Sequence, residues 1–296
     1  MASTRDLRRR IKSIKNTSQI TKAMQMVAAS KMRRAQQAAL AGRPYADLMN
    51  QMLGEVTAAT GDFSHPLIEK REDGNGKRAV LLITTDKGLC GALNTNILRE
   101  VDKQDKAKEA VYVCAGKKGG QFIHRTKRDL NAEFHYKDTP EFAEARAISK
   151  YVQDLFTKGE VDSVDVMFTN FVSTLTQTPE IQRLLPIGEI HAVQSDVVGA
   201  DREAELKHDD AKEFLFEPNP AEVLGSLLPH YLNYQIYQML LEAKASEHSA
   251  RMVAMKNATD NAKQIIKDLT LEYNKLRQAA ITSELLEITT AQMALG

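Results

Sequence analysis

Two short segments hold the residue types that most often carry chemistry. Residues 85–91 (TDKGLCG) place Asp86, Lys87 and Cys90 directly after an apolar run, where α/β proteins commonly position their sites. Residues 116–120 (GKKGG) follow a second apolar run and offer backbone amides and two lysines to a phosphate group. A catalytic thiol and a nucleotide site are therefore the two kinds of chemistry to test.

Neither segment has the partners that such chemistry needs. No G-x-x-x-x-G-K-[ST] motif occurs, and residues 116–120 lack both G-x-G-x-x-G spacing and a hydroxyl after the lysines to hold Mg²⁺. Cys90 has no histidine nearby in sequence to activate it, and no two histidines have the i, i+4 spacing of a helical zinc site. We predict no catalytic residue, cofactor or metal ion, and interpret residues 116–120 as a tight strand-to-helix turn, with nucleotide binding as the alternative.

The elements around these segments alternate between strand and helix, which predicts a small parallel, Rossmann-like sheet. Continuous apolar runs indicate strands buried on both faces. Cys90 and Cys114 lie in apolar contexts, so we expect buried free thiols. Residues 172–218 are less regular. The expected elements are strands at 79–84, 110–115, 131–135 and 161–171 and helices at 92–105 and 140–158, the last capped by Thr139 with Pro140 in its first position.

Glycine and proline divide the chain into two unbroken flanks and a punctuated middle. Residues 2–41 and 230–295 contain neither, so both flanks are expected to be helical, about 60 and 100 Å long at 1.5 Å per residue. Helices of this length need a partner helix to be stable in water.

Both flanks carry a heptad pattern, which predicts a left-handed coiled coil. The seam of the first flank is small and partly polar, which permits close approach but gains less from burial. The first seam comprises Leu7, Ile11, Ile14, Ser18, Thr21, Gln25, Ala28, Met32, Ala35 and Ala39, and the second Leu241, Ala245, His248, Met252, Met255, Thr259, Ala262, Ile266, Leu269, Tyr273, Leu276 and Ala280.

The two flanks are expected to pair with each other in antiparallel fashion around the inserted α/β domain. If Gly42 lies near residue 230, the second helix is longer, and residues from about 271 onward project as a single helix. Its end, residues 288–295, has no charged side chain. Either this tip frays in water, or another protein surrounds it.

Charge is distributed unevenly along the chain. Residues 1–41 hold ten Lys or Arg against one acid, whereas residues 42–229 hold 23 basic and 31 acidic residues. The basic arm indicates either a solvated helix face or an acidic partner. A nucleic-acid-binding or scaffolding coiled coil is thus an alternative, although no aromatic side chain occurs in residues 1–44. A nucleotide- or sugar-binding enzyme is a further alternative, and the missing phosphate-binding motif counts against it.

The beginning of the chain has no apolar stretch like that of a signal peptide, and no apolar run reaches the length of a membrane span. We therefore expect a protein made for the cytoplasmic side.

Four segments resemble the ATP synthase gamma subunit family of bacterial type, in family order. They are residues 20–33 (ITKAMQMVAASKMR), 85–94 (TDKGLCGALN), 245–262 (ASEHSARMVAMKNATDNA) and 273–285 (YNKLRQAAITSEL). The family usually has Arg and Gly where Lys87 and Ala92 stand.

The resemblance implies a non-catalytic rotor shaft rather than an enzyme. Such a shaft stands inside a ring of alpha and beta subunits, and its foot rests with epsilon on the membrane ring of c subunits; delta belongs to the same complex. Ion flow turns the ring and the shaft, and the shaft drives the beta subunits through ATP synthesis, or the reverse for pumping. The implied location is peripheral, at the cytoplasmic face of the bacterial inner membrane.

Residue roles are carried over from the same resemblance. It implies that a coupling set faces the acidic lever of beta or its neighbours, and that Phe214 and Glu217 contact the c ring or epsilon. The family often has tyrosines where Phe214 and Phe216 stand. The coupling set is Met24, Arg251, Gln278, Thr282 and Glu284. The expected domains are an N-terminal coiled-coil helix at 1–60, the central α/β domain at 75–190, an irregular loop or foot at 191–218 and a C-terminal coiled-coil helix at 219–296 that pairs with 1–60.

Overall fold

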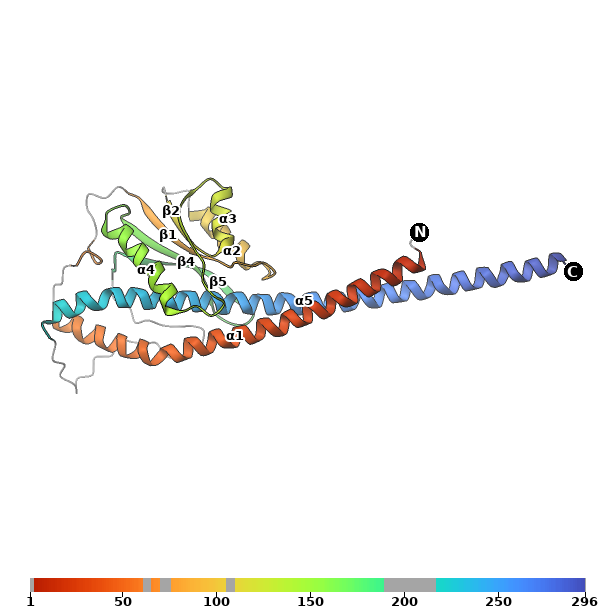
Figure 1. The fold of residues 1–296 in the computed structure, drawn as a ribbon, viewed down its shortest axis with the longest axis horizontal. Coiled ribbons are helices and arrows are strands. Elements are labelled where there is room, and N and C mark those ends of the chain that lie inside the picture. The colour runs from red at the N-terminus through yellow and green to blue at the C-terminus, as the bar shows by residue number, and fades with distance from the viewer. Residues whose placement is uncertain (1–2, 61–64, 70–75, 105–109, 189–216, 296) are drawn as a thin grey trace. The chain divides into compact units, whose positions relative to one another are not determined.

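A computed structural model describes residues 3–60, 65–69, 76–104, 110–188 and 217–295. Two compact units divide these residues: a helical unit (residues 1–27 and 252–296) and an α/β unit (residues 28–251). Both contain parts of two long helices (Figure 1). The elements are α1 (Thr4–Thr60), β1 (Arg78–Ile83), α2 (Leu93–Gln104), β2 (Ala110–Ala115), α3 (Lys117–Arg125), β3 (Asp129–Phe134), α4 (Phe142–Thr157), β4 (Ser163–Phe171), β5 (Gln177–Leu185) and α5 (Pro220–Leu295).

Both long helices extend beyond the flanks that lack glycine and proline. α1 passes through Gly42 and Pro44, and α5 begins at Pro220 and passes through Pro229. A proline inside a helix costs about 3 kcal/mol, whereas each fully buried large apolar side chain contributes about 1.5–3 kcal/mol. Burial beyond each proline therefore outweighs the lost hydrogen bond. The buried side chains are Met49, Leu53 and Val56 in α1 and Tyr231, Leu232 and Ile236 in α5.

The sheet has the order β3-β2-β1-β4-β5. The first four strands are parallel, as predicted, and their bounds lie within two residues of the expected ones. The sequence analysis did not predict the fifth strand, β5. This strand pairs antiparallel with β4, so the Rossmann-like sheet is mixed. β5 is an edge strand with only its last two residues buried, so it lacks the continuous apolar run that marks β1 and β2.

Helix α4 begins two residues later than predicted. Glu141, not Thr139, is the N-cap, and a capping box joins it to Glu144. Glu141 is favoured as the N-cap because the Glu144 carboxylate accepts its backbone N–H at 2.9 Å and so satisfies a donor at the helix start.

Helices cover both faces of the sheet (Figure 1). One face packs on α4 and on buried side chains of α1 and α5, including Leu53, Phe156 and Leu240. The other packs on α2 and α3 through Ile97, Val101 and Ile123. The sheet is thereby attached along one face to the long helices.

Within the α/β unit the two long helices lie side by side and run in opposite directions. Ala35 and Ala39 share a buried cluster with Leu241 and Ala245. Further along α1, the Tyr234 hydroxyl donates to the Gly42 carbonyl at 2.7 Å. This contact supports the expectation that Gly42 lies near residue 230. A Cβ at Gly42 would lie 2.6 Å from that hydroxyl, so the glycine permits the close approach.

In the helical unit, the buried residues follow the predicted heptad spacing. Leu7, Met255, Thr259 and Ala262 are buried, and the Thr21 and Thr259 hydroxyls hydrogen-bond at 2.7 Å. Among the described side chains of α5, Leu276 is the last that is partly buried, and residues 277–293 are all exposed, including Ala280, which was predicted to lie in the seam. The single-helix segment therefore starts about five residues later than the expected 271.

Candidate functional site: a buried ion cluster between helix and sheet

The turn after β1 is closed by its own side chains. The Thr84 hydroxyl accepts the Gly119 N–H at 2.8 Å, and the Asp86 carboxylate accepts the Lys117 N–H at 3.0 Å, in the first turn of α3. A phosphate would use such helix N-terminal donors. Gly116 has φ +109°, and a Cβ there would lie 2.2 Å from the Thr84 carbonyl oxygen. These glycines thus serve a tight turn, which favours the structural interpretation over nucleotide binding.

Cys90 lies at the end of this turn and is buried, as is Cys114. The Asn94 amide donates to the Cys90 sulfur at 3.3 Å. Burial raises the pKa of the Cys90 thiol, and burial raises that of Cys114 to about 12. Both thiols are therefore protonated at neutral pH, which disfavours nucleophilic chemistry. The expected buried free thiols are confirmed.

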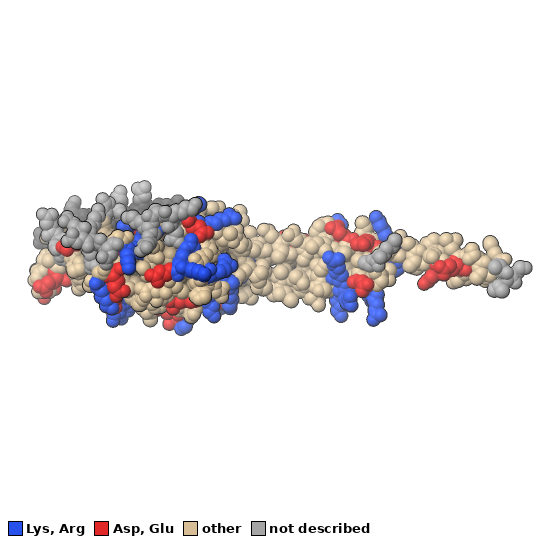
Figure 2. Space-filling view, turned by 90° about the horizontal axis from the view of Figure 1, so that it is seen from above, with Lys and Arg blue, Asp and Glu red and all other residues tan. Residues whose placement is uncertain are grey.

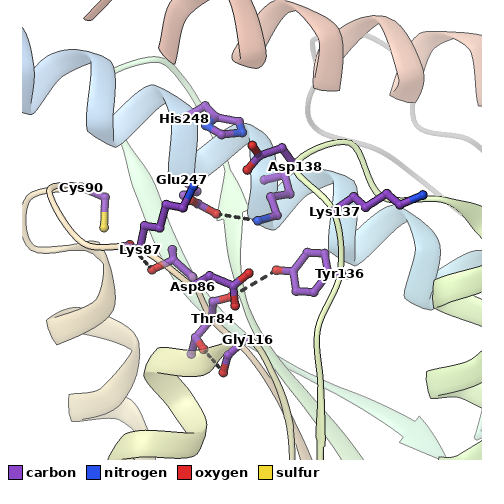
Figure 3. A network of polar contacts seen from close by, with 12 residues as sticks. Thr84, Asp86, Lys87, Cys90, Gly116, Tyr136, Lys137, Asp138, Glu247 and His248 are labelled. Carbon is purple, nitrogen blue, oxygen red and sulfur yellow. Dashed lines mark hydrogen bonds and ion pairs between the residues drawn. The ribbon is translucent and has the colours of Figure 1, made fainter. Parts of the chain in front are cut away.

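Above the turn, α5 holds two cations on one carboxylate, that of Glu247, which Figure 3 labels beside His248. Glu247 accepts from the Lys244 ammonium at 3.0 Å and from the Arg251 guanidinium at 2.7 Å. The side chains of Lys244, Glu247 and Arg251 are 2%, 4% and 11% exposed. Their spacing of three and four residues places all three on one face of the helix.

This buried ion cluster connects α5 with two segments at the carboxyl edge of the sheet. Arg251 donates to the carbonyls of Lys87 and Gly88 at 3.2–3.3 Å. The Lys244 ammonium lies 4.5 Å from the centre of the Tyr136 ring, and the Tyr136 hydroxyl donates to the Thr84 carbonyl at 3.2 Å. The cluster therefore fixes the α/β sheet on the long helix.

His248 lies against the same cluster and is 1% exposed. Its Nδ1 lies 3.3 Å from an Arg251 nitrogen, which places the ring proton on Nε2 because the guanidinium is only a donor. Burial lowers the pKa of His248 to about 4; Glu247 and Asp138 oppose the shift, and Arg251 and Lys244 add to it. The ring is therefore neutral at pH 7.

A second ion pair ties α1 to the segment after β3. Lys31 bonds with the Asp138 carboxylate, and this bond lowers the pKa of Asp138. Both long helices are thus joined to the loops at one edge of the sheet. Among the described residues, no three His, Cys, Asp or Glu side chains are placed to hold a metal ion.

The predicted coupling residues lie in different surroundings. Arg251 belongs to the ion cluster, and Met24 is half-buried on α1. Gln278, Thr282 and Glu284 are exposed on α5, and the Thr282 hydroxyl donates to the Gln278 carbonyl. Of the foot residues, Glu217 is exposed, and Phe214 lies outside the described residues.

Sequence reasoning missed Lys244, Glu247 and Tyr136 as parts of one site. The i, i+3 and i+4 spacing of Lys244, Glu247 and Arg251 was a usable signal. Their burial and their contacts with Tyr136 and residues 87–88 depend on the packing of distant segments, which local spacing does not encode.

The basic arm lies outward on α1. Arg5, Arg8, Arg9 and Arg10 are exposed, whereas the seam residue Leu7 between them is buried. In Figure 2, Lys and Arg side chains alternate with Asp and Glu over the visible face of the α/β unit rather than forming one basic surface. No described helix has the length and apolarity needed to cross a membrane.

The two long paired helices carry a Rossmann-like sheet through a buried ion cluster, and side chains close the turn at the strand ends. This architecture is that of a stalk class of protein. The family profile described as ATP synthase matches residues 3–295. The ATP synthase gamma chain of Opitutus terrae is 54% identical, over 99% of both chains, and that of Methylacidiphilum infernorum 46%, over the whole of both. The chain belongs to the ATP synthase gamma chain family and is a non-catalytic stalk subunit.

Solved structures agree with this assignment. The central stalk and c-ring structure of the Tetrahymena thermophila mitochondrial ATP synthase contains a chain that is 26% identical, with a TM-score of 0.58 and coverage of 81% of this chain and 99% of that one. A chain of the Euglena gracilis mitochondrial ATP synthase, solved with OSCP, F1 and c-ring, shares the fold at 20% identity, with a TM-score of 0.68 and coverage of 99% and 94%.

Proposed function

We propose that the chain works as the rotating central shaft of an ATP synthase, with its two long helices wound as an antiparallel, left-handed coiled coil. The heptad spacing of both seams supports the supercoil, since a period of 3.5 residues requires a left-handed twist. In both units the seam residues, up to Leu276, are buried or half-buried. A shaft must be stiff, and continuous paired helices supply stiffness.

The proposed partners are the alpha, beta, epsilon and delta subunits and the c ring. Rotation of the c ring turns the shaft, and its asymmetric surface contacts each beta subunit differently in turn. Differential contacts of this kind shift a two-state subunit between conformations of different nucleotide affinity. The proposed location is peripheral, at the cytoplasmic face of the bacterial inner membrane, through the c ring.

The proposed contacts with the catalytic ring are Met24, Gln278, Thr282 and Glu284, which present exposed or half-buried side chains. Arg251 belongs to the same set, but its guanidinium is already bonded to Glu247 and residues 87–88. It therefore meets a partner through a small exposed fraction and mainly positions the helix.

Each of the predicted domains has its own proposed role. Segments 1–60 and 219–296 form the shaft, and the domain at 75–190 mounts on it through the ion cluster. Residues 191–218 form a foot, in which Phe214 and Glu217 contact the c ring or epsilon.

One observation carries the proposal: α5 extends past its last partly buried residue as a helix whose described side chains from Ile288 on are exposed and uncharged. Ile288 is 58% and Met293 84% exposed. Such an apolar surface marks an interaction site, and an apolar sleeve in the catalytic ring fits it without fixed ionic contacts that would resist rotation.

Co-purification and cross-linking test the shaft. The tagged chain should recover alpha, beta and epsilon subunits with Mg-ATPase activity, and a photo-crosslinker at Met293 should label alpha or beta. A crosslinker at Lys137 in the α/β domain is the control and should not label the same sites. Recovery of nucleic acid alone, or of a lone chain with its own turnover, would contradict the proposal.

A further inference from the structure

A cavity of about 250 Å³ lies at the amino ends of β1 and β4, at the sheet edge opposite to the ion cluster. Two guanidinium groups and one ammonium group line it, together with carboxylate, amide and hydroxyl side chains. The lining residues are Gly76, Lys77, Arg78, Gln104, Asp162, Ser163 and Arg183.

The two arginines share one carboxylate. Asp165 is 4% exposed and accepts from Arg78 at 3.4 Å and from Arg183 through its other oxygen. Each guanidinium has five N–H donors, so one shared carboxylate leaves several available. Lys77 adds a third cation against Asp162 and Asp165, and the carbonyl end of α2 at Gln104 offsets only part of this charge. The cavity thus favours an anion.

One of these donors is buried without a partner. The Arg78 Nε has no hydrogen-bond partner among the described residues, and the Arg78 side chain is only 14% exposed. A buried donor left unpaired is costly, so a ligand oxygen at this position would be favoured. Guanidinium groups bind tetrahedral oxyanions with two parallel hydrogen bonds.

The cavity also holds an acceptor that an ordinary anion cannot satisfy. Asp162 Oδ2 is buried and lacks a hydrogen-bond partner in the described part of the chain. A ligand that fits must accept hydrogen bonds from arginine and also donate one to a carboxylate. Sulfate has no proton at neutral pH and would face Asp162 with repulsion, whereas monohydrogen phosphate carries a P–OH donor.

We propose that this cavity binds a protonated tetrahedral oxyanion of the phosphate class, held by Arg78 and Arg183 and selected against sulfate by Asp162. Inorganic phosphate keeps a P–OH group at pH 7, whereas a phosphate monoester, whose second pKa is about 6, is mostly a dianion without that donor. The free phosphate ion is therefore the ligand that fits. The site is separate from the ion cluster, and its existence does not depend on the shaft role.

Titration calorimetry of the full-length chain at pH 7 and constant ionic strength tests the site with inorganic phosphate and sulfate. Phosphate should bind at least about tenfold more tightly than sulfate, because only phosphate satisfies the buried acceptor. In Asp162→Asn the amide can donate to either anion, so the two affinities should become similar. Glycerol phosphate in a parallel titration separates the sources: it should bind more weakly than inorganic phosphate because its dianion has no P–OH donor. Equal or tighter binding of the ester would contradict the selection by Asp162.

Arg183→Gln is the second variant, and the side chain is 54% exposed, so the core is left intact. It should weaken phosphate binding about tenfold. Lys137→Gln removes an exposed cation elsewhere in the same domain and should leave binding unchanged. Absence of phosphate binding, equal affinity for sulfate in the wild type, or an equal loss in Lys137→Gln would each overturn the proposal.

Discussion

Glu247 is the residue on which the mounting of the sheet depends, because one buried carboxylate neutralises two cations. A buried ion pair adds little net stability compared with apolar packing, but removal of one partner leaves uncompensated charge. Lys244 and Arg251 would then remain 2% and 11% exposed without their acceptor.

Glu247→Gln should therefore lower the free energy of unfolding by about 3–5 kcal/mol. Urea unfolding followed by circular dichroism measures the change. The matched control is Lys103→Gln, which breaks a pair whose lysine is 71% exposed and should cost less than about 1 kcal/mol. A similar small loss in both variants would show that the cluster is not structurally important.

His248 makes stability depend on pH. Its pKa is about 4 in the fold, below the ordinary 6.5, so protonation favours the unfolded chain. Its stabilising contribution is complete above pH about 6.5, falls as pH decreases, and is lost below about 4, with a total on the order of 3 kcal/mol. Unfolding free energies of wild type and His248→Gln should diverge in slope across this window. Parallel curves would contradict the assignment.

At the scale of elements, the alanines of α1 set how closely the two long helices approach. Ala35 and Ala39 are fully buried against Leu241 and Ala245. A larger side chain at this seam must displace the facing helix, since packed interiors leave no room for added methylenes.

Ala39→Leu should thus destabilise the chain by about 1–3 kcal/mol through overpacking. Ala41→Leu, two residues away on the exposed side of the same helix, should stay within about 0.5 kcal/mol of wild type. Thermal unfolding monitored by circular dichroism compares the two. If both variants behave alike, the seam does not lie where the burial pattern places it.

At the scale of the whole molecule, the stiffness of the proposed shaft matters because the shaft transmits rotation to its partner subunits. Met24 is half-buried in a family segment, residues 20–33, that is uncharged up to Ser30 except for Lys22. Met24→Lys adds a cation where the resemblance implies an acidic lever of beta.

We expect Met24→Lys to permit assembly but loosen coupling, because the new cation can form an ion pair that resists rotation. ATP hydrolysis and proton pumping, measured in the same membrane vesicles, should change by different factors. Met26→Lys, at a residue that is 60% exposed, is a nearby comparison. Equal changes in hydrolysis and pumping for Met24→Lys would count against the proposed contact.

The periodic parts of the fold followed from the sequence alone. Heptad spacing placed the seam residues of both helices, from Leu7 to Leu276, at positions that are buried or half-buried, and apolar runs located β1 and β2 to within a residue. These patterns are readable because each residue's environment repeats with its own element.

Long-range packing decided the rest. Whether Pro44 ended α1 depended on what Met49 and Leu53 met beyond it, and the edge strand β5 became a strand only by pairing with β4. Likewise, the spacing of Lys244 and Glu247 did not indicate that the turn at residues 87–88 and Tyr136 would enclose them. Local sequence determined periodicity and charge, whereas burial arises between segments far apart in the chain, and only the tertiary structure brings those segments together.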